Sequence, residues 1–572
     1  MLRARLRPRL SAFTLLIGAT SALAAWTPPD TAQLARLDRA LAPSHAQYDP
    51  AEQMLRRPFS SPGYHTALTG GFVHGTKDSL AYAVGLLDTG RPADLERAVA
   101  VIRRVVGLQD SDPASKTYGI WSWFLEEPLA RMSPPDFNWA DFNGVSLLQI
   151  ARDHRTRLPA DLTRAVDASI LHACRAIKKR NVGPGYTNIA VMGTYVTLVA
   201  GELYDLPEFK TYGLERLKRF YDYTNENGAF EEYNSPTYTI VALSELSRLK
   251  AHVQTPAAQP MIDALVRRAW EEVATHFHAP TLQWAGPHSR AYSSLNRTSA
   301  LAIIERATAG RVNFGLDDPD REERRLPFLC PTDLEPQFGP LKEPRTVTET
   351  FIKRSDTVGT TYLHPKFALG TINRGDMWNQ RRPLLLHFGT AAQPGYVQLR
   401  FLKNHYDFSS AIFTGAQREG LAVGAVHLIT DGGDTHISLD KVKNGKIRAR
   451  DLRLRFEVGG PAAKGVRVTA GPASEIATPN LKIAINIARA RFDGHDATIS
   501  AGGDDKIKWL DVVFFTGEDR EFDLAALDEA FAAFSLSVGA PVTPTIKLES
   551  GRGIITASGL TVSAPLKPTP RN

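Results

Sequence analysis

The sequence is poor in cysteine, and beyond its first 25 residues it contains no long uninterrupted apolar run. Its two cysteines, Cys174 and Cys330, stand in unlike contexts and exclude both a disulfide-dense small scaffold and a zinc-type cysteine cluster. They are compatible with one disulfide in an oxidising compartment or with two buried thiols. A bilayer span needs about 20 apolar residues, so we expect no membrane insertion of the mature chain.

Basic runs interleaved with aromatic residues are also missing, which argues against nucleic acid as a partner. The formal net charge is +7, but four of the positive charges are arginines within the first 25 residues, so the remaining excess is about +3. A modest positive excess is compatible with an acidic substrate. With 43% hydrophobic and 23% charged residues over 572 positions, the composition is that of a globular protein of several domains.

Residues 1–25 have the pattern of a secretory signal. Arg3, Arg5, Arg7 and Arg9 form a positive segment, and a short apolar run follows. Small residues around Ala24 then supply a cleavage site for a signal peptidase. We therefore expect a secreted or periplasmic protein whose mature chain begins near residue 26.

Helical periodicity dominates residues 26–315. In Ala93–Leu108, for example, apolar residues recur at the spacing of one helix face. Further helices are predicted over Asp161–Lys179, Ile189–Leu203, Tyr238–Leu249 and Pro260–Phe277. Many helices of similar length, each bounded by Pro, Gly or Asp, favour an (α/α) helical toroid over a simple four-helix bundle.

The period changes in the second half of the chain. Residues 316–349 are rich in proline and charge and are predicted to be a linker. In residues 350–572, Leu452–Val458 alternates strictly between apolar and charged residues, and Lys506–Phe515, Thr545–Leu548 and Gly553–Val562 are further predicted strands. We expect an antiparallel β-sandwich here, interrupted by one helix over Asp523–Phe534. The predicted fold class is thus a multidomain α+β protein.

Four polar and aromatic loops precede helices in the first half. They are residues 137–144 (FNWADFNG), 183–188 (GPGYTN), 228–238 (GAFEEYNSPTY) and 284–292 (WAGPHSRAY). Each is explained singly by helix capping or by a satisfied tyrosine. Their joint occurrence instead predicts one rim of the toroid lined by Asn, Tyr, His, Arg and Trp, which suits a sugar because aromatic faces stack on pyranose rings.

A polar and aromatic stretch of the second half, residues 370–382, either leans over this rim or forms a buried network between the domains. Residues 403–407 (KNHYD) also lie in a segment able to reach it. The predicted substrate-binding residues are Trp139, Asn143, Glu232, Tyr233, Tyr292, Trp378, Gln380, Arg381 and His405.

The order of these loops resembles that of the toroid-plus-sandwich polysaccharide lyases, which include chondroitin and hyaluronan lyases and the heparinase II/III and alginate lyase group. The likeness lies in Phe137-Asn138-Trp139 with Asn143-Gly144, then Thr187-Asn188, and then Asn227 to Phe230 leading to Tyr233 and Tyr238. It implies that Asn188 binds a uronate carboxylate and that Tyr238 acts as catalytic acid, or as acid and base. Where hyaluronan-type enzymes carry a catalytic histidine, this chain has Tyr233. The base is then Tyr233, Tyr238 or another residue, of which His288 is the best candidate.

β-Elimination removes the C5 proton of a uronate and expels the 4-O-linked sugar. Donors directed at the carboxylate reduce the negative charge that opposes the developing enediolate, and Asn188, helped by Asn143 and Arg290, suits this task. A positioned acid and base complete the reaction, which Tyr238 and His288 suit. The sequence therefore predicts a lyase without an organic cofactor that acts on an acidic polysaccharide.

Other interpretations remain open. A glycoside hydrolase needs two facing carboxyl groups, which Glu231 or Glu232 with Asp141 would supply. A non-catalytic glycan-binding or envelope scaffold protein would use the same aromatic and polar rim. Residues of the segment 427–436 offer metal ligands, His427, Asp431, Asp434 and His436, although its Asp-Gly-Gly-Asp stretch is more simply a hairpin turn. No metal is predicted.

Overall fold

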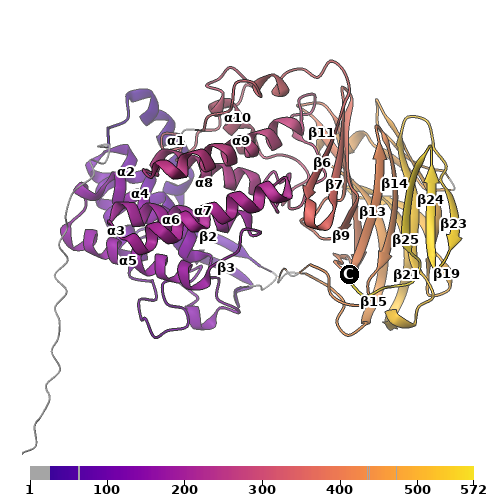
Figure 1. The fold of residues 1–572 in the computed structure, drawn as a ribbon, viewed down its shortest axis with the longest axis horizontal. Coiled ribbons are helices and arrows are strands. Elements are labelled where there is room, and N and C mark those ends of the chain that lie inside the picture. Colours follow the sequence, from indigo (N-terminus) through magenta and orange to yellow (C-terminus); the bar gives the residue numbers. More distant parts are fainter. Residues whose placement is uncertain are drawn as a thin grey trace, which may run out of the picture.

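The computed structural model describes residues 26–61, 65–326, 328–434, 436, 439–471 and 473–571. Helices occupy the first half of the chain and antiparallel sheets the second (Figure 1). The predicted order of a helical domain followed by a β domain is therefore confirmed. The predicted signal sequence of residues 1–25 lies outside the described residues. Within the described ranges, no helix combines the length and apolar character needed to cross a membrane.

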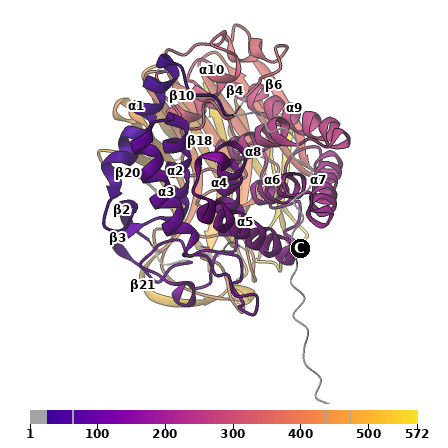
Figure 2. The same ribbon diagram turned by 90° about the vertical axis from the view of Figure 1, so that its left-hand side faces the viewer.

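The helical half contains two layers of helices. These are α1 (Thr31–Gln47), α2 (Thr76–Thr89), α3 (Pro92–Val106), α4 (Trp139–Asp153), α5 (Ala160–Arg180), α6 (Thr187–Leu203), α7 (Pro207–Asn227), α8 (Tyr238–His252), α9 (Gln259–Thr275) and α10 (Thr298–Ala307). Helices α2, α4, α6 and α8 contact one another in that order, and each packs against the helix that follows it. This is the arrangement of a helical toroid, seen end-on in Figure 2.

The two layers differ in sequence because they differ in burial. The inner helix α6 is buried at every position from Thr187 to Gly201, so it is apolar or small around its whole circumference. The outer helix α3 buries only a stripe that includes Ala98, Ile102 and Val105, and of its charged residues only Asp94 is buried. The helices predicted from periodicity coincide with α3, α5, α6, α8 and α9, whereas α2 and α7 were not predicted.

Short strands decorate the helical half. They are β1 (Tyr48–Asp49), β2 (Met54–Ser60) and β3 (Gly70–His74), which form one small sheet, and β4 (Phe277–His278) with β5 (Gln283–Trp284). The segment that follows α10, predicted to be a linker, packs on the helical half through ion pairs. Arg325 binds Asp88, and Glu323 binds Arg36. This segment is therefore an ordered part of the helical surface.

The β half consists of two large antiparallel sheets and a small third one. The first contains β20 (Thr498–Gly503), β21 (Lys508–Asp523), β15 (Lys446–Gly459), β11 (Pro394–Lys403), β10 (Leu384–Gly389), β8 (Phe367–Ile372), β7 (Thr357–His364) and β6 (Arg345–Ile352) in that order, with β12 (Tyr406–Asp407) beside β11. The second contains β16 (Arg467–Thr469), β17 (Ser474–Ala477), β18 (Lys482–Phe492), β22 (Ala530–Val538), β14 (Leu421–Leu428), β13 (Ala411–Arg418) and β9 (Arg374–Asp376), with β19 (His495–Asp496) beside β18. The third contains β23 (Thr545–Glu549), β24 (Arg552–Ala557) and β25 (Leu560–Pro565).

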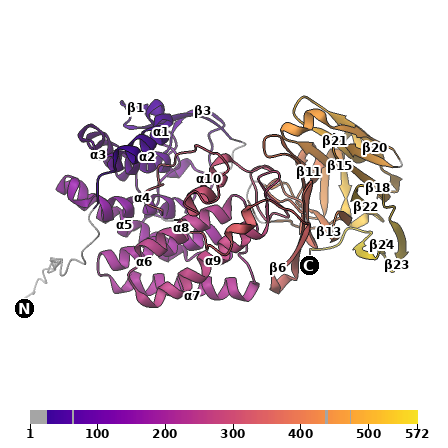
Figure 3. The same cartoon turned by 90° about the horizontal axis from the view of Figure 1, so that it is seen from above.

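One apolar core joins the inner faces of the two large sheets, as a sandwich requires, and includes Leu386 and Phe456 from one sheet and Ile485 and Phe534 from the other. A second core lies between the second sheet and β24 and β25. Figure 3 shows the resulting layers beside the helical half. The predicted antiparallel sandwich is confirmed, with this third sheet added.

Two sequence-based expectations are wrong in detail. The helix predicted over Asp523–Phe534 is a single 3₁₀ turn, Leu524–Ala526, followed by strand β22. Because Phe534 faces one core and Phe531 the other, β22 is apolar on both faces and lacks the alternation that identifies a half-exposed strand. Strand β6 begins at Arg345, inside the range predicted as linker, and its alternating Thr and Glu residues belong to an edge strand.

Candidate active site between the two domains

The loop before Tyr292 pairs with the first large sheet through backbone hydrogen bonds. His288 and Arg382 exchange two N–H···O=C bonds of 3.1 and 3.0 Å, and the Ala291 N–H donates to the Gln380 carbonyl at 2.6 Å. The sheet approaches so closely that a Cβ atom on Gly370 would lie 1.8 Å from the Gly286 carbonyl oxygen. This contact fixes the loop between the domains, with Arg290 in its middle.

The Arg290 guanidinium is held from both domains. Its Nη1 donates to Glu232 Oε1 at 2.7 Å, and its Nε and Nη2 donate to Gln380 Oε1 at 3.1 and 3.0 Å. Its Cζ lies 4.1 Å from the centre of the Tyr238 ring and 5.2 Å from that of Trp378. A cation held this way has one fixed position, which suits it to bind an anionic group of a ligand.

Glu232 connects Arg290 to the start of helix α6. Its Oε2 accepts the backbone N–H of Asn188 at 3.2 Å, and its own backbone N–H donates to Thr187 Oγ1 at 3.2 Å. Burial raises the pKa of the Glu232 carboxyl above its usual range. The carboxyl is thus enclosed and fully engaged in positioning its neighbours.

Asn188 carries a polar group without a partner. Its side chain is 5% exposed, and its Oδ1 has no hydrogen-bond partner among the described residues. Buried polar atoms are normally paired, so an unpaired one at the start of a helix suits a ligand. Rotation of the amide exchanges its oxygen and nitrogen, so Asn188 can present a donor at this place.

Tyr238 is the first residue of helix α8, and its hydroxyl forms a hydrogen bond with that of Tyr292. The two hydroxyl oxygens are 2.7 Å apart. Ser235 caps the helix by accepting the Tyr238 N–H at 2.8 Å, and its hydroxyl donates to the Arg290 carbonyl at 2.6 Å. Burial raises the pKa of Tyr238 well above its usual value. The phenol is therefore protonated at neutral pH and able to act as an acid.

The β domain contributes Trp378 and His436 to the opposite wall. Their ring centroids are 5.0 Å apart, and the Trp378 indole N–H is buried without a hydrogen-bond partner in the part of the chain that the structure describes. Burial first, and then the positive charge of Arg290, lower the pKa of His436 to about 4. Its imidazole is therefore neutral at neutral pH. Arg381 lies beside them and binds Asp376 and Asp434.

A hollow with an empty volume of about 420 Å³ opens on the helical wall. It is lined by Trp123 and Trp139, whose rings stack with centroids 5.0 Å apart, and by Arg57, Phe59, Lys77 and Phe124 among others. The Trp139 indole N–H donates to Thr76 Oγ1 at 2.9 Å, which fixes its face. Stacked indoles with a cationic rim suit a sugar ring that carries negative charge.

Asn138 joins this hollow to the Arg290 cluster. Its Nδ2 donates to the Tyr186 hydroxyl at 3.1 Å, and its Oδ1 accepts Arg180 Nη1 at 2.6 Å. Burial raises the pKa of Tyr186, and the charges of Arg290 and Glu232 act on it as well. Asn138 therefore holds Tyr186 near enough to Arg290 and Glu232 for their charges to act on its phenol.

The structure brings together Asn188, Glu232, Tyr238, Arg290, Tyr292, Trp378, Gln380 and Arg381, with Trp139 in the adjoining hollow. Four other predicted site residues lie elsewhere. His288 is 2% exposed and its Nδ1 donates to the Asn234 carbonyl at 2.6 Å. Tyr233 stacks on Phe351 at 4.3 Å in the apolar contact between the domains. Asn143 is fully buried in α4, and His405 is exposed in the turn before β12.

The carboxyl groups expected of a hydrolase do not meet. Glu231 Oε1 accepts Arg354, and its Oε2 accepts the Tyr223 hydroxyl at the domain boundary. Asp141 is 2% exposed inside the helical layers, where burial raises its pKa to about 7. Neither carboxyl group faces Glu232 across an open space.

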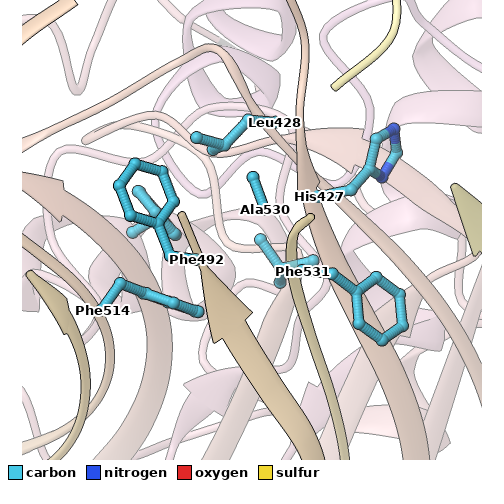
Figure 4. Close-up of a pocket in the computed structure, with 8 residues that line it drawn as sticks. His427, Leu428, Phe492, Phe514, Ala530 and Phe531 are labelled. Carbon is cyan, nitrogen blue, oxygen red and sulfur yellow. The ribbon is translucent and has the colours of Figure 1, made fainter. Parts of the chain in front are cut away.

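The segment 427–436, whose side chains offer metal ligands, does not form a metal centre where the structure describes it. Among the described residues, no group of three or more His, Cys, Asp and Glu side chains is arranged to hold a metal ion. His427 instead lines a small apolar hollow with an empty volume of about 180 Å³ inside the sandwich, together with Phe492, Phe514 and Phe531 (Figure 4). Cys174 and Cys330 are both buried free thiols.

The chain is similar to one domain family and to several solved structures. Residues 38–313 match the model of a domain family of unknown function, DUF8769. No curated protein matches the sequence. The structure is similar to chondroitin AC lyase from Streptomyces coelicolor, with 11% identity, a TM-score of 0.43 and coverage of 96% of this chain and 86% of that one.

Two further solved structures align over most of the chain. Heparan sulfate lyase from Pedobacter heparinus is 9% identical, with a TM-score of 0.36 and coverage of 95% and 90%. Endoglucanase CelQ from Clostridium thermocellum is 9% identical, with a TM-score of 0.28 and coverage of 89% and 83%.

Sequence reasoning missed several residues of the cleft. Trp123, Lys77 and Tyr186 were not among the predicted site residues, and His436 was considered only as a metal ligand. The three aromatic residues of the segment 121–124 (WSWF), which precedes the loop of Trp139, were the available signal for Trp123. His436 carries no such signal, because the fold alone brings its segment to the helical domain.

Proposed function

We propose that the protein is a polysaccharide lyase that cleaves a uronic-acid-containing glycan by β-elimination in the cleft between its domains. The observation that carries this proposal is the Arg290 guanidinium, which is fixed by Glu232 and Gln380 and lies over the ring of Tyr238. An immobile cation and a buried phenol in contact are the two groups that elimination from a uronate needs first.

Arg290 and Asn188 bind the uronate carboxylate. Their donors offset its negative charge, so that charge can develop on the carboxylate as the C5 proton leaves. The rigidity of Arg290 matters because preorganised donors need no rearrangement during the reaction. Its two protein acceptors, Glu232 Oε1 and Gln380 Oε1, supply that rigidity.

Tyr238 and His436 transfer the protons. The neutral imidazole of His436 removes the C5 proton, the electron pair forms the C4–C5 double bond, and the C4–O4 bond breaks. The Tyr238 hydroxyl donates its proton to the departing O4. The assignment rests on position, since the His436 ring lies against Trp378 and the Tyr238 ring under Arg290. The pKa shifts give the resting states that it needs, a neutral imidazole and a protonated phenol.

The hollow at Trp123 and Trp139 supports a glycan rather than a small molecule as substrate. Its lining combines two indoles with Arg57, Lys77 and Asp78, and Asn138, the neighbour of Trp139, binds Tyr186. A chain of sugars that reached from this hollow to Arg290 would occupy both places at once. We propose the same acidic polysaccharide or oligosaccharide for both, and a secreted or periplasmic location in keeping with the signal sequence.

The test is incubation with a panel of uronate-containing glycans, following the ultraviolet absorbance of the unsaturated uronate. We expect one or more glycans to give this signal, and Tyr238→Phe and Asn188→Ala to abolish it while circular dichroism stays unchanged. Both variants near full rate would refute the site. Reducing ends without new absorbance would indicate a hydrolase, and binding without turnover a glycan-binding protein.

A further inference from the structure

Tyr292 lies at the boundary between solvent and the buried side chains around Tyr238. Its side chain is 52% exposed, yet its hydroxyl oxygen lies 2.7 Å from that of Tyr238, which is 8% exposed. Most exposed aromatic side chains have no buried polar partner. The pair therefore connects an enclosed phenol to solvent through one hydrogen bond.

The surroundings of Tyr238 leave few other routes for a proton. Arg290 covers the face of its ring, and the guanidinium is engaged with Glu232 and Gln380. Ser235, the nearest hydroxyl on its own loop, is occupied as helix cap and as donor to the Arg290 carbonyl. Among the described residues, Tyr292 is the hydrogen-bond partner of the Tyr238 hydroxyl.

The reaction creates a need for such a route. If Tyr238 gives its proton to O4, it is left as a phenolate that must regain a proton before the next turnover. Tyr238 is only 8% exposed, so water has little direct access to its hydroxyl even before a glycan is bound. Tyr292 stays in contact with solvent on the other side of the hydrogen bond.

We propose that Tyr292 is the proton entry of the active site, relaying a proton from solvent to Tyr238 after each elimination. This inference rests on the proposed function. Tyr292 donates its hydroxyl proton to the Tyr238 phenolate and takes one from water or a buffer acid. The proton that His436 accepted from C5 returns to solvent, so protons balance over the cycle.

The backbone holds Tyr292 in this place. Ala291, its neighbour, donates to the Gln380 carbonyl at 2.6 Å, and Arg290 is fixed on the other side of Ala291. The position of Tyr292 therefore depends on the same interdomain pairing that positions Arg290. A phenol placed for sugar stacking alone would not need its hydroxyl at hydrogen-bond distance from another.

Tyr292→Phe tests the relay because it keeps the ring and removes the hydroxyl. We expect kcat to fall roughly 100-fold with KM nearly unchanged, at the lower end of the range for general acid catalysis. Raising the concentration of imidazole buffer at constant pH should restore part of kcat in the variant and leave the wild type unaffected. The solvent deuterium isotope effect on kcat should increase in the variant.

Tyr223→Phe is the matched control, since it removes a half-buried phenol whose hydroxyl binds Glu231 outside the cleft. It should retain wild-type kcat at every buffer concentration. A rise in KM with unchanged kcat in Tyr292→Phe, or a loss of kcat that buffer does not relieve, would overturn the relay. A wild-type protein inactive on every uronate glycan would overturn the proposed function, and the relay with it.

Discussion

The guanidinium carbon of Arg290 lies 4.1 Å above the centre of the Tyr238 ring. Arg290 comes from a loop paired with the β domain, whereas Tyr238 opens a helix of the helical domain. A cation over a phenol ring stabilises the pair and favours negative charge on the oxygen. The contact therefore couples the group that binds the carboxylate to the group that transfers the proton.

Glu232→Gln should weaken this coupling. The amide keeps the shape of the side chain but loses the charge that anchors Arg290 Nη1 at 2.7 Å. A hydrogen bond to a charged group contributes about 1.5–3 kcal/mol, so we expect kcat/KM to fall at least roughly tenfold. Glu231→Gln, the neighbour that faces Arg354 instead, is the control in the same absorbance assay. Equal losses in both variants would contradict the assigned role of Glu232.

Removing the indole platform should weaken binding of long chains. We expect Trp139→Ala to raise KM about tenfold on long substrates. An aromatic contact contributes about 0.5–1.5 kcal/mol, and the variant also loses the apolar area that the indole would bury against the sugar. Trp139→Phe should retain most of the affinity because it keeps an aromatic face. Trp509→Ala is the control: Trp509 lies on the β domain beneath Arg455, and the variant should keep the wild-type KM. An effect on kcat instead of KM would argue against a binding platform.

The pH dependence of kcat/KM should report His436. The base must be neutral, and its neutral fraction grows as pH rises through its pKa of about 4. We therefore expect the acid limb of the profile near pH 4, whereas an unperturbed imidazole would place it near 6.5. His436→Gln should be nearly inactive at every pH. A limb near 6.5 that survives in His436→Gln would identify a different base.

Asp141 should make the folded protein less stable at higher pH. Burial raises the pKa of this carboxyl in the folded protein to about 7. At a pH between the ordinary aspartate pKa and 7, the carboxyl is therefore protonated in the folded protein and ionised in the unfolded chain. The free energy of unfolding falls across that window, by roughly 4 kcal/mol for a shift of this size. Asp141→Asn, which mimics the neutral acid, should narrow the difference in Tm between pH 5 and pH 8. An unchanged difference would show that Arg216 keeps Asp141 ionised.

Helices with a clear period, such as α3, were predictable, and so was α6 although it is buried on every side, whereas α2 and α7 were not. The buried stripe of α3 repeats at helical spacing, so its bounds follow from the sequence within a few residues. Helix α2 is buried on nearly every side, and α7 is rich in charged and aromatic residues. Neither shows a narrow apolar face. Strand β22, buried against two cores, was taken for a helix for the same reason.

The residues of the candidate site also differ in how far the sequence predicts their place. Asn188, Tyr238 and Arg290 follow from loops at helix starts, where polar residues beyond those needed for capping are visible in the sequence. The burial of His288 and the stacking of Tyr233 on Phe351 depend on where the sheet meets the helices. No local pattern encodes that contact. Only the folded arrangement separates residues that line the cleft from residues that hold it together.

The exchange of backbone hydrogen bonds between His288 and Arg382 also bears on how the chain can be divided. Expressing the two halves as separate chains would leave Arg290 on one fragment and Gln380 on the other. On each fragment the neighbouring backbone N–H and C=O groups would lack their hydrogen-bond partners. The fragments would have to re-form these backbone hydrogen bonds before the candidate site could assemble. Inheritance of the two halves as one polypeptide is thus a requirement of the chemistry.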